Sequence, residues 1–302
     1  MKRIVLLIAT NFAVLLLLGI VMQIFGIDEW LARRGQSYEA LLVMSAIFGF
    51  GGAFVSLLAS KWIAKMTMGV QVIQQPSSEA ERWLVETVRS HAQKADIGMP
   101  EVGVFESPDP NAFATGARRD AALVAVSTGL LHSMRRDEVE AVLGHEIAHV
   151  ANGDMVTLTL IQGVLNTFVI FLARIIGGIV DSNTRGNDDQ NRGPGMGYFF
   201  TVMIAQIVLG LFASMIVAWF SRRREFRADA GGADLAGTRS MIGALEALKR
   251  AHTPSQMPEN LAAFGIHGSG VTGLKKLFMS HPPLEERIEA LEQRTAALGR
   301  AS

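Results

Sequence analysis

The sequence His145-Glu146-Ile147-Ala148-His149 stands six residues before an apolar stretch of membrane length, residues 155–180. Side chains four positions apart in a helix lie on the same face, about one turn from each other. The two imidazoles are therefore spaced to hold one zinc ion, with Glu146 between them as a general base for water. A metal motif beside an apolar stretch predicts a hydrolytic site close to a membrane.

The composition excludes several classes of protein and of metal site. Of the 302 residues, 49% are hydrophobic and 19% are charged, whereas soluble domains average ~25% charged residues. Basic and acidic residues number 28 each, so charge gives no support to nucleic-acid binding. The chain has no cysteine, so any metal must be held by His, Asp or Glu.

Four apolar stretches approach the ~20 residues that cross a bilayer, namely residues 4–25, 41–60, 155–180 and 198–220. The first follows two basic residues, as a signal peptide does, but its apolar core is too long for a cleavable one, so we predict a retained anchor. Glycines 49, 51 and 52 in the second stretch suit close helix packing. For residues 155–180 the alternative is a buried helix of a soluble domain, because Arg174 is costly in lipid.

Basic residues flank the start of the first stretch, the end of the second and the end of the fourth. The positive-inside rule places these three ends on the cytoplasmic side. The sequence thus predicts an α+β integral membrane protein that is mainly α-helical, with four hydrophobic helices and a zincin-like cytoplasmic catalytic domain. The predicted parts are a membrane region 1–65, a zincin-like part 66–154, a membrane hairpin 155–220 and a C-terminal helical part 221–302.

The zincin-like part shows the periodicities of a small sheet and two helices. We expect helices at 78–94 and 137–152, with Ser77 or Ser78 capping the first. Strands are expected at 101–106 and 121–127, with a further extended segment at 111–116. In the second helix, which carries the motif, Gly144 and Ala148 leave room for another element to approach closely.

A catalytic zinc site usually has three protein ligands, so we expect one more. The membrane hairpin returns the chain to the side it left, with His149 six residues before it and Glu225 five residues after it. At ~1.5 Å per residue both lie within about 10 Å of the membrane boundary. We therefore predict Glu225 as the third ligand, the alternative being a carboxylate that balances the arginines at 222–224. Asp229 is a candidate to accept a ring N–H from a ligating histidine, or else an ordinary surface acid.

The sequence resembles a known family through three ordered motifs, which are His145–His149, Glu225-Phe226-Arg227-Ala228-Asp229 and His281-Pro282-Pro283-Leu284-Glu285-Glu286-Arg287. It is similar to the membrane-integrated zinc metalloproteases of family M48, in particular to the bacterial HtpX heat-shock group. The resemblance implies one zinc ion per chain, held by His145, His149 and Glu225, with Glu146 as catalytic base. It also implies a multi-pass protein of the inner membrane whose active site faces the cytoplasm. Such a protease degrades damaged membrane proteins alongside other membrane quality-control proteases.

The resemblance extends to residues beyond the ligands. The segment Asn111-Ala112-Phe113-Ala114 matches the family's edge strand beside the substrate, where an extended peptide adds by main-chain hydrogen bonds. A plain strand with Phe113 in the core is the alternative. His281 and Arg287 match the late motif and are expected to contact the substrate carbonyl or the oxyanion formed from it. The alternative is that this late motif only starts the last helix, which would explain Pro282 and Pro283 but not His281.

Two other functions fit part of the sequence. A CAAX-type prenyl protease would use the same chemistry, but the integral enzymes of that type have more spans. A non-catalytic membrane scaffold with a vestigial zinc site would not need Glu146. Structural zinc is also expected to have four protein ligands, and the sequence offers three good ones. We therefore predict a zinc-dependent endopeptidase that acts on polypeptides at the lipid bilayer.

Overall fold

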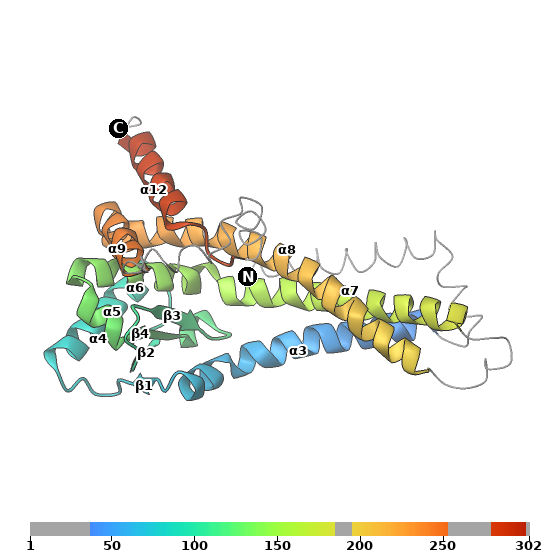
Figure 1. Cartoon of the computed structure of the whole chain (residues 1–302). Helices are drawn as coiled ribbons and strands as arrows, with labels where there is room; N and C mark the ends of the chain where they lie inside the picture. The colour runs from blue at the N-terminus through green and yellow to red at the C-terminus, as the bar shows by residue number, and fades with distance from the viewer. Residues whose placement is uncertain (1–36, 185–194, 253–278, 300–302) are drawn as a thin grey trace, which may run out of the picture. The chain divides into compact units, whose positions relative to one another are not determined.

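The computed structural model describes residues 37–184, 195–252 and 279–299 (Figure 1). The chain divides into two compact units: Met1–Ser56 with Thr157–Val217, and Leu57–Val156 with Ala218–Ser302. We call the first the membrane unit and the second the catalytic unit. Their boundaries fall inside three helices, α3 (Tyr38–Thr67), α7 (Asp154–Thr184) and α8 (Met196–Ala236).

Helices α3, α7 and α8 are each long and apolar enough to cross a membrane. They contain the predicted stretches 41–60, 155–180 and 198–220, so the helical prediction is confirmed for these three. The predicted span 4–25 lies outside the described residues. Helix α8 does not stop at the basic residues 222–224 but continues to Ala236, so Glu225 stands in the same helix as the fourth stretch.

Glycine permits close packing between α3 and α7 in the membrane unit. A Cβ at Gly49 would lie 2.6 Å from the backbone nitrogen of Thr167, which is closer than real Cβ atoms approach. The buried Phe171 of α7 packs nearby against Leu41 and Leu42 of α3. Of the three glycines expected to pack closely, Gly49 has this contact, whereas a Cβ at Gly51 or Gly52 would meet no described atom within 4 Å.

We expect Gly49→Ala to destabilise the protein in detergent by about 1–3 kcal/mol, because the new methyl group would overlap the backbone of α7. The matched control is Gly52→Ala in the same helix, which should be neutral or stabilising by up to about 1 kcal/mol because alanine favours helix. Thermal unfolding of the two variants measures the difference. Equal unfolding temperatures would contradict the packing described here.

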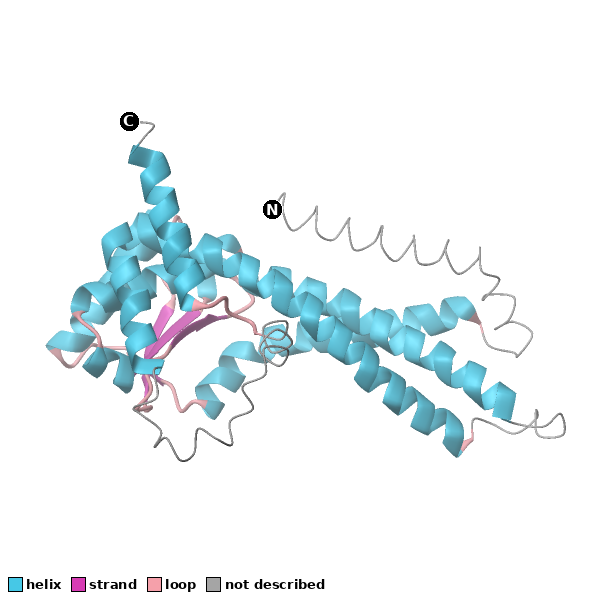
Figure 2. Cartoon of the chain, turned by 45° about the horizontal axis from the view of Figure 1, so that its top comes forward, coloured by secondary structure: helices cyan, strands magenta, loops and turns pink. Residues whose placement is uncertain are grey.

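The catalytic unit contains one small mixed sheet. Its strands are β1 (Gln71–Val72), β2 (Glu101–Phe105), β3 (Ala112–Thr115) and β4 (Leu123–Ser127), in the order β1-β2-β4-β3. Strands β2 and β4 are parallel, and the other two pairings are antiparallel. The three expected extended segments are thereby confirmed, and β3 lies at the edge of the sheet. The sheet is the only strand structure among the described residues, shown in magenta in Figure 2.

Five further helices of the described residues enclose the main core. Helices α4 (Glu79–Lys94), α5 (Thr128–Ser133) and α6 (Arg136–Asn152) contact the sheet, whereas α9 (Thr238–His252) packs on α6 and α12 (Leu284–Gly299) packs on α9. Ser78 caps α4 by accepting a hydrogen bond from the Glu81 backbone, as expected. Strand β4 is buried along its whole length, and its valines join Leu143 and Ile147 of α6 in one apolar cluster. The core therefore fixes the helix that carries the histidine motif.

Candidate metal centre

Helix α6 keeps the two histidines away from water and leaves Glu146 accessible. Every residue from 141 to 150 is buried except Glu146, which is half-buried. The helix ends at Gly153, whose φ of +70° is the left-handed conformation that glycine adopts without strain. Apolar neighbours thus fix the orientation of His145 and His149, while the base between them stays open to a water molecule.

Helix α8 approaches α6 closely at two glycines. A Cβ at Gly232 would lie 2.9 Å from the backbone nitrogen of His145, and one at Gly231 would lie 2.6 Å from the Cβ of Ala148. The close approach expected at Gly144 and Ala148 is therefore made by α8. Because Glu225 and Asp229 precede Gly232 by seven and three residues, they lie on the face of α8 that meets α6.

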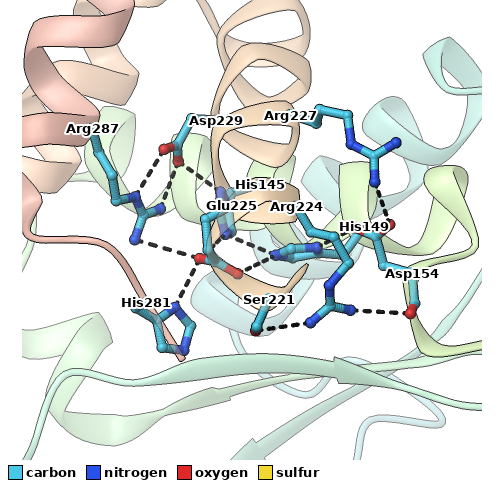
Figure 3. Close-up of polar contacts among 10 residues, drawn as sticks. All are labelled: His145, His149, Asp154, Ser221, Arg224, Glu225, Arg227, Asp229, His281 and Arg287. Carbon is cyan, nitrogen blue, oxygen red and sulfur yellow. Dashed lines mark hydrogen bonds and ion pairs between the residues drawn. The ribbon is translucent and has the colours of Figure 1, made fainter. Parts of the chain in front are cut away.

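Three side chains from these helices converge (Figure 3). The Nε2 atoms of His145 and His149 are 3.1 Å apart. Glu225 Oε1 lies 3.3 Å from His149 Nε2, and Glu225 Oε2 lies 3.6 Å from His145 Nε2. Tetrahedral zinc with bonds of 2.0–2.1 Å separates its ligand atoms by about 3.3 Å. The donor atoms, all buried, therefore suit a metal ion of this kind.

The surrounding carboxylates favour positive charge at the two imidazoles. Burial alone would lower the pKa of His149, but hydrogen bonds to Asp154 and Glu225 outweigh it and raise the pKa to about 10. Burial also opposes the charged form of His145, and contacts with Asp229 and Glu225 again raise the pKa above its usual value. A cation bound between the rings would take the place of these protons.

Asp229 and Arg287 form a buried pair behind His145. Asp229 Oδ1 lies 3.0 Å from His145 Nδ1. The Arg287 guanidinium donates two hydrogen bonds to Asp229, from Nε to Oδ2 at 2.8 Å and from Nη2 to Oδ1 at 2.6 Å. Its Nη1 lies 3.6 Å from Glu225 Oε2. Arg287 thus contacts carboxylates of the site, and its expected contact with the substrate stays a prediction.

His281 reaches the same cluster from the segment before α12. Its Nδ1 lies 2.8 Å from Glu225 Oε2, and its side chain is 64% exposed. Arg222 holds this segment by donating a hydrogen bond to the carbonyl of Met279 at 2.8 Å. The structure therefore brings His281 to the site from far along the sequence, and its role toward substrate stays a prediction.

Asn111 and Phe113 lie along the edge strand rather than within this cluster. The Asn111 backbone pairs with Ser127 at the end of β4, through its N–H to Ser127 Oγ and its carbonyl from Ser127 N–H. Phe113 is half-buried and its ring lies 5.6 Å from that of Phe105. Phe113 thus packs at the margin of an apolar cluster that includes Phe105 and Leu123, and the role of this strand beside a substrate stays a prediction.

One residue of the site was not identified from the sequence. Asp154 Oδ2 lies 2.7 Å from His149 Nδ1. The sequence signal was an acid just after the glycine that ends the motif helix. It was missed because Asp154 follows His149 by five residues across a helix end, where the spacing rule for one helix face no longer applies.

Comparison with known proteins decides the family. Peptidase family M48 matches residues 78–295. This chain belongs to peptidase family M48. Protease HtpX of Thioalkalivibrio sulfidiphilus is 61% identical over 294 residues, covering 97% of this chain and 99% of the relative. Protease HtpX of Xanthomonas campestris is 60% identical, covering 96% and 97%. The chain is thus an HtpX-type M48 protease.

The fold has a counterpart among solved structures. The crystal structure of S. mikatae Ste24p superposes with a TM-score of 0.60 at 18% identity, covering 95% of this chain and 67% of that one. At this identity the likeness concerns the fold alone. The family match and the HtpX relatives, with the three apolar helices, show that this M48 chain is a membrane metalloprotease.

We expect Gly232→Ala to reduce the bound metal below one ion per chain and to lower the unfolding temperature. The added methyl group would push α8 away from the His145 backbone and carry Glu225 with it. Gly243→Ala in α9 is the control, since its Cβ would meet neighbours only at 3.7–3.8 Å. Metal analysis after dialysis reports the result. Wild-type metal content in Gly232→Ala would contradict the role given to the helix crossing.

Proposed function

We propose that this M48 protease is a zinc-dependent endopeptidase of the bacterial cytoplasmic membrane that hydrolyses peptide bonds of misfolded or damaged membrane proteins. In this proposal His145, His149 and Glu225 hold one zinc ion and Glu146 is the general base. The observation that carries the proposal is the convergence of two ring nitrogens and a carboxylate, 3.1–3.6 Å apart, beside the half-buried Glu146. We further propose that it works alongside other membrane quality-control proteases.

The side chains divide the chemistry between them. When bound, zinc would supply a Lewis acid that polarises the scissile carbonyl and makes water more acidic. Glu146 would take the proton of that water and pass it to the leaving amine. Its half-buried position suits this task, since a base in contact with water on one side can both accept and release a proton. Asp229 would keep His145 in the orientation needed for binding the ion.

The edge strand β3 supports a polypeptide as substrate. Among the described residues β3 pairs with β4 alone, so its outer main-chain groups are available to an extended peptide. Asn111 and Phe113 would then flank the bound chain. A scaffold protein would have no use for Glu146 or for an open strand edge beside a metal site.

We expect Glu146→Gln to retain about one zinc ion per chain and to lose casein cleavage by at least about 10²-fold, because the amide keeps the shape but cannot take a proton. Glu225→Ala should lose both zinc and cleavage, since it removes a ligand. Purified protein in detergent with zinc restored allows both measurements on the same sample. A folded Glu146→Gln variant that cleaves as well as wild type would contradict the assigned base.

Basic residues support the proposed cytoplasmic side. Lys61 and Lys65 stand at the C-terminal end of α3, within the catalytic unit, and both pair with Glu101 of the same unit. Arg222, Arg223 and Arg224 follow the fourth apolar stretch. Positively charged residues beside spans favour the cytoplasmic face, so the catalytic unit would lie in the cytoplasm.

The absence of native cysteine permits a direct test of sidedness. A cysteine in place of Glu86, whose side chain is 69% exposed on α4, should react with a membrane-impermeant maleimide in inverted vesicles but not in intact spheroplasts. Ser37→Cys, exposed at the start of α3, should show the reverse. Labelling of the Glu86 position in spheroplasts would contradict the proposed orientation.

A further inference from the structure

Asp154 is a buried carboxylate beside the metal cluster that is not one of its three proposed ligands. The residue is 1% exposed, and its Oδ2 lies 2.7 Å from His149 Nδ1. The opposite ring nitrogen, Nε2, is the atom that faces His145 and Glu225. Asp154 therefore contacts His149 on the side away from the cluster (Figure 3).

The turn between two helices brings this carboxylate back to the histidine. Gly153 ends α6 in the left-handed conformation, and its N–H donates to the carbonyl of Val150 at 3.0 Å. Asp154 is the first residue of α7, where the helix dipole favours a negative charge. A single residue, Gly153, separates the two helices, and the Asp154 side chain lies beside the imidazole five positions earlier.

Helix α8 holds Asp154 from the other side. Arg224 donates from Nη1 to the Asp154 carbonyl and from Nη2 to Ser221 Oγ, both at 3.0 Å. Arg227 Nη2 lies 3.7 Å from Asp154 Oδ1. These arginines flank Glu225 in the sequence, so the helix that supplies the third proposed ligand also fixes the carboxylate behind His149.

We infer that Asp154 is a positioning residue for His149. By accepting the Nδ1–H it selects the tautomer whose Nε2 lone pair faces the metal, and it fixes the rotation of the ring. On a different helix, Asp229 Oδ1 lies 3.0 Å from the corresponding Nδ1 of His145. This inference rests on the proposed function, because it assigns His149 as a metal ligand.

The test compares Asp154→Asn and Asp154→Ser with the control Glu138→Gln. Asparagine keeps the size of the side chain without its charge. Serine suits the start of a helix and is too short to reach His149, so it removes the acceptor without a bulky change. Glu138 is a buried carboxylate of the same helix as the histidines, paired with Arg135 and Arg250 instead. Zinc affinity by chelator competition and the visible spectrum of cobalt-loaded protein are measured in detergent for each.

We expect zinc to bind 10–100-fold more weakly to Asp154→Ser, which cannot accept the Nδ1–H, with altered cobalt bands. Asp154→Asn should lose less affinity, because its amide oxygen can still accept that hydrogen bond. Glu138→Gln should keep the wild-type affinity and spectrum even where its unfolding temperature falls. A folded Asp154→Ser variant with wild-type affinity and spectrum would overturn the inference while the proposed function stands. If wild type itself held no zinc, the proposed function would fail and the inference with it.

Discussion

The close crossing of α6 and α8 is the constraint on which the site depends. Gly231 and Gly232 of α8 lie so close to Ala148 and His145 of α6 that a Cβ atom on either glycine would overlap them. At a wider separation a carboxylate on α8 would not reach two imidazoles on α6 at once. The apolar cluster around Leu143 and Ile147 holds α6 in place for this contact, so the core and the site share one helix.

The crossing has an electrostatic consequence, because it buries three carboxylates beside two histidines. Buried charges are stable only when they are paired and hydrogen-bonded. Here Arg287 pairs with Asp229, His149 and Arg227 contact the Asp154 carboxylate, and Glu225 faces both rings. The carboxylates around the ring nitrogens carry negative charge, which a bound divalent cation would neutralise. The same arrangement leaves Glu146 outside the buried network, as a group free to exchange protons would require.

Two parts of this site could be predicted from the sequence: the histidine pair, from its spacing within one helix, and Glu225, from the return of the chain after the membrane hairpin. The spacing of His145 and His149 gave one face of α6, and the return of the hairpin brought Glu225 close to it. Asp154 was missed because its contact depends on a left-handed turn between two helices. Strand β1 and helix α5 were missed because two and six residues carry too little periodicity. The part after residue 221 was predicted to be helical, but the sequence did not show that this helix continues the fourth apolar stretch without a break and ends at Ala236.

The most direct test of this account is zinc K-edge X-ray absorption of the wild-type protein after zinc is restored. The account predicts a four-coordinate zinc ion with two imidazole ligands, and oxygen in the remaining positions from Glu225 and solvent. A third imidazole would contradict it, because His281 would then be a ligand and the site would lack its open position. Fewer than two imidazoles would contradict the assignment of His145 and His149 as the ligand pair.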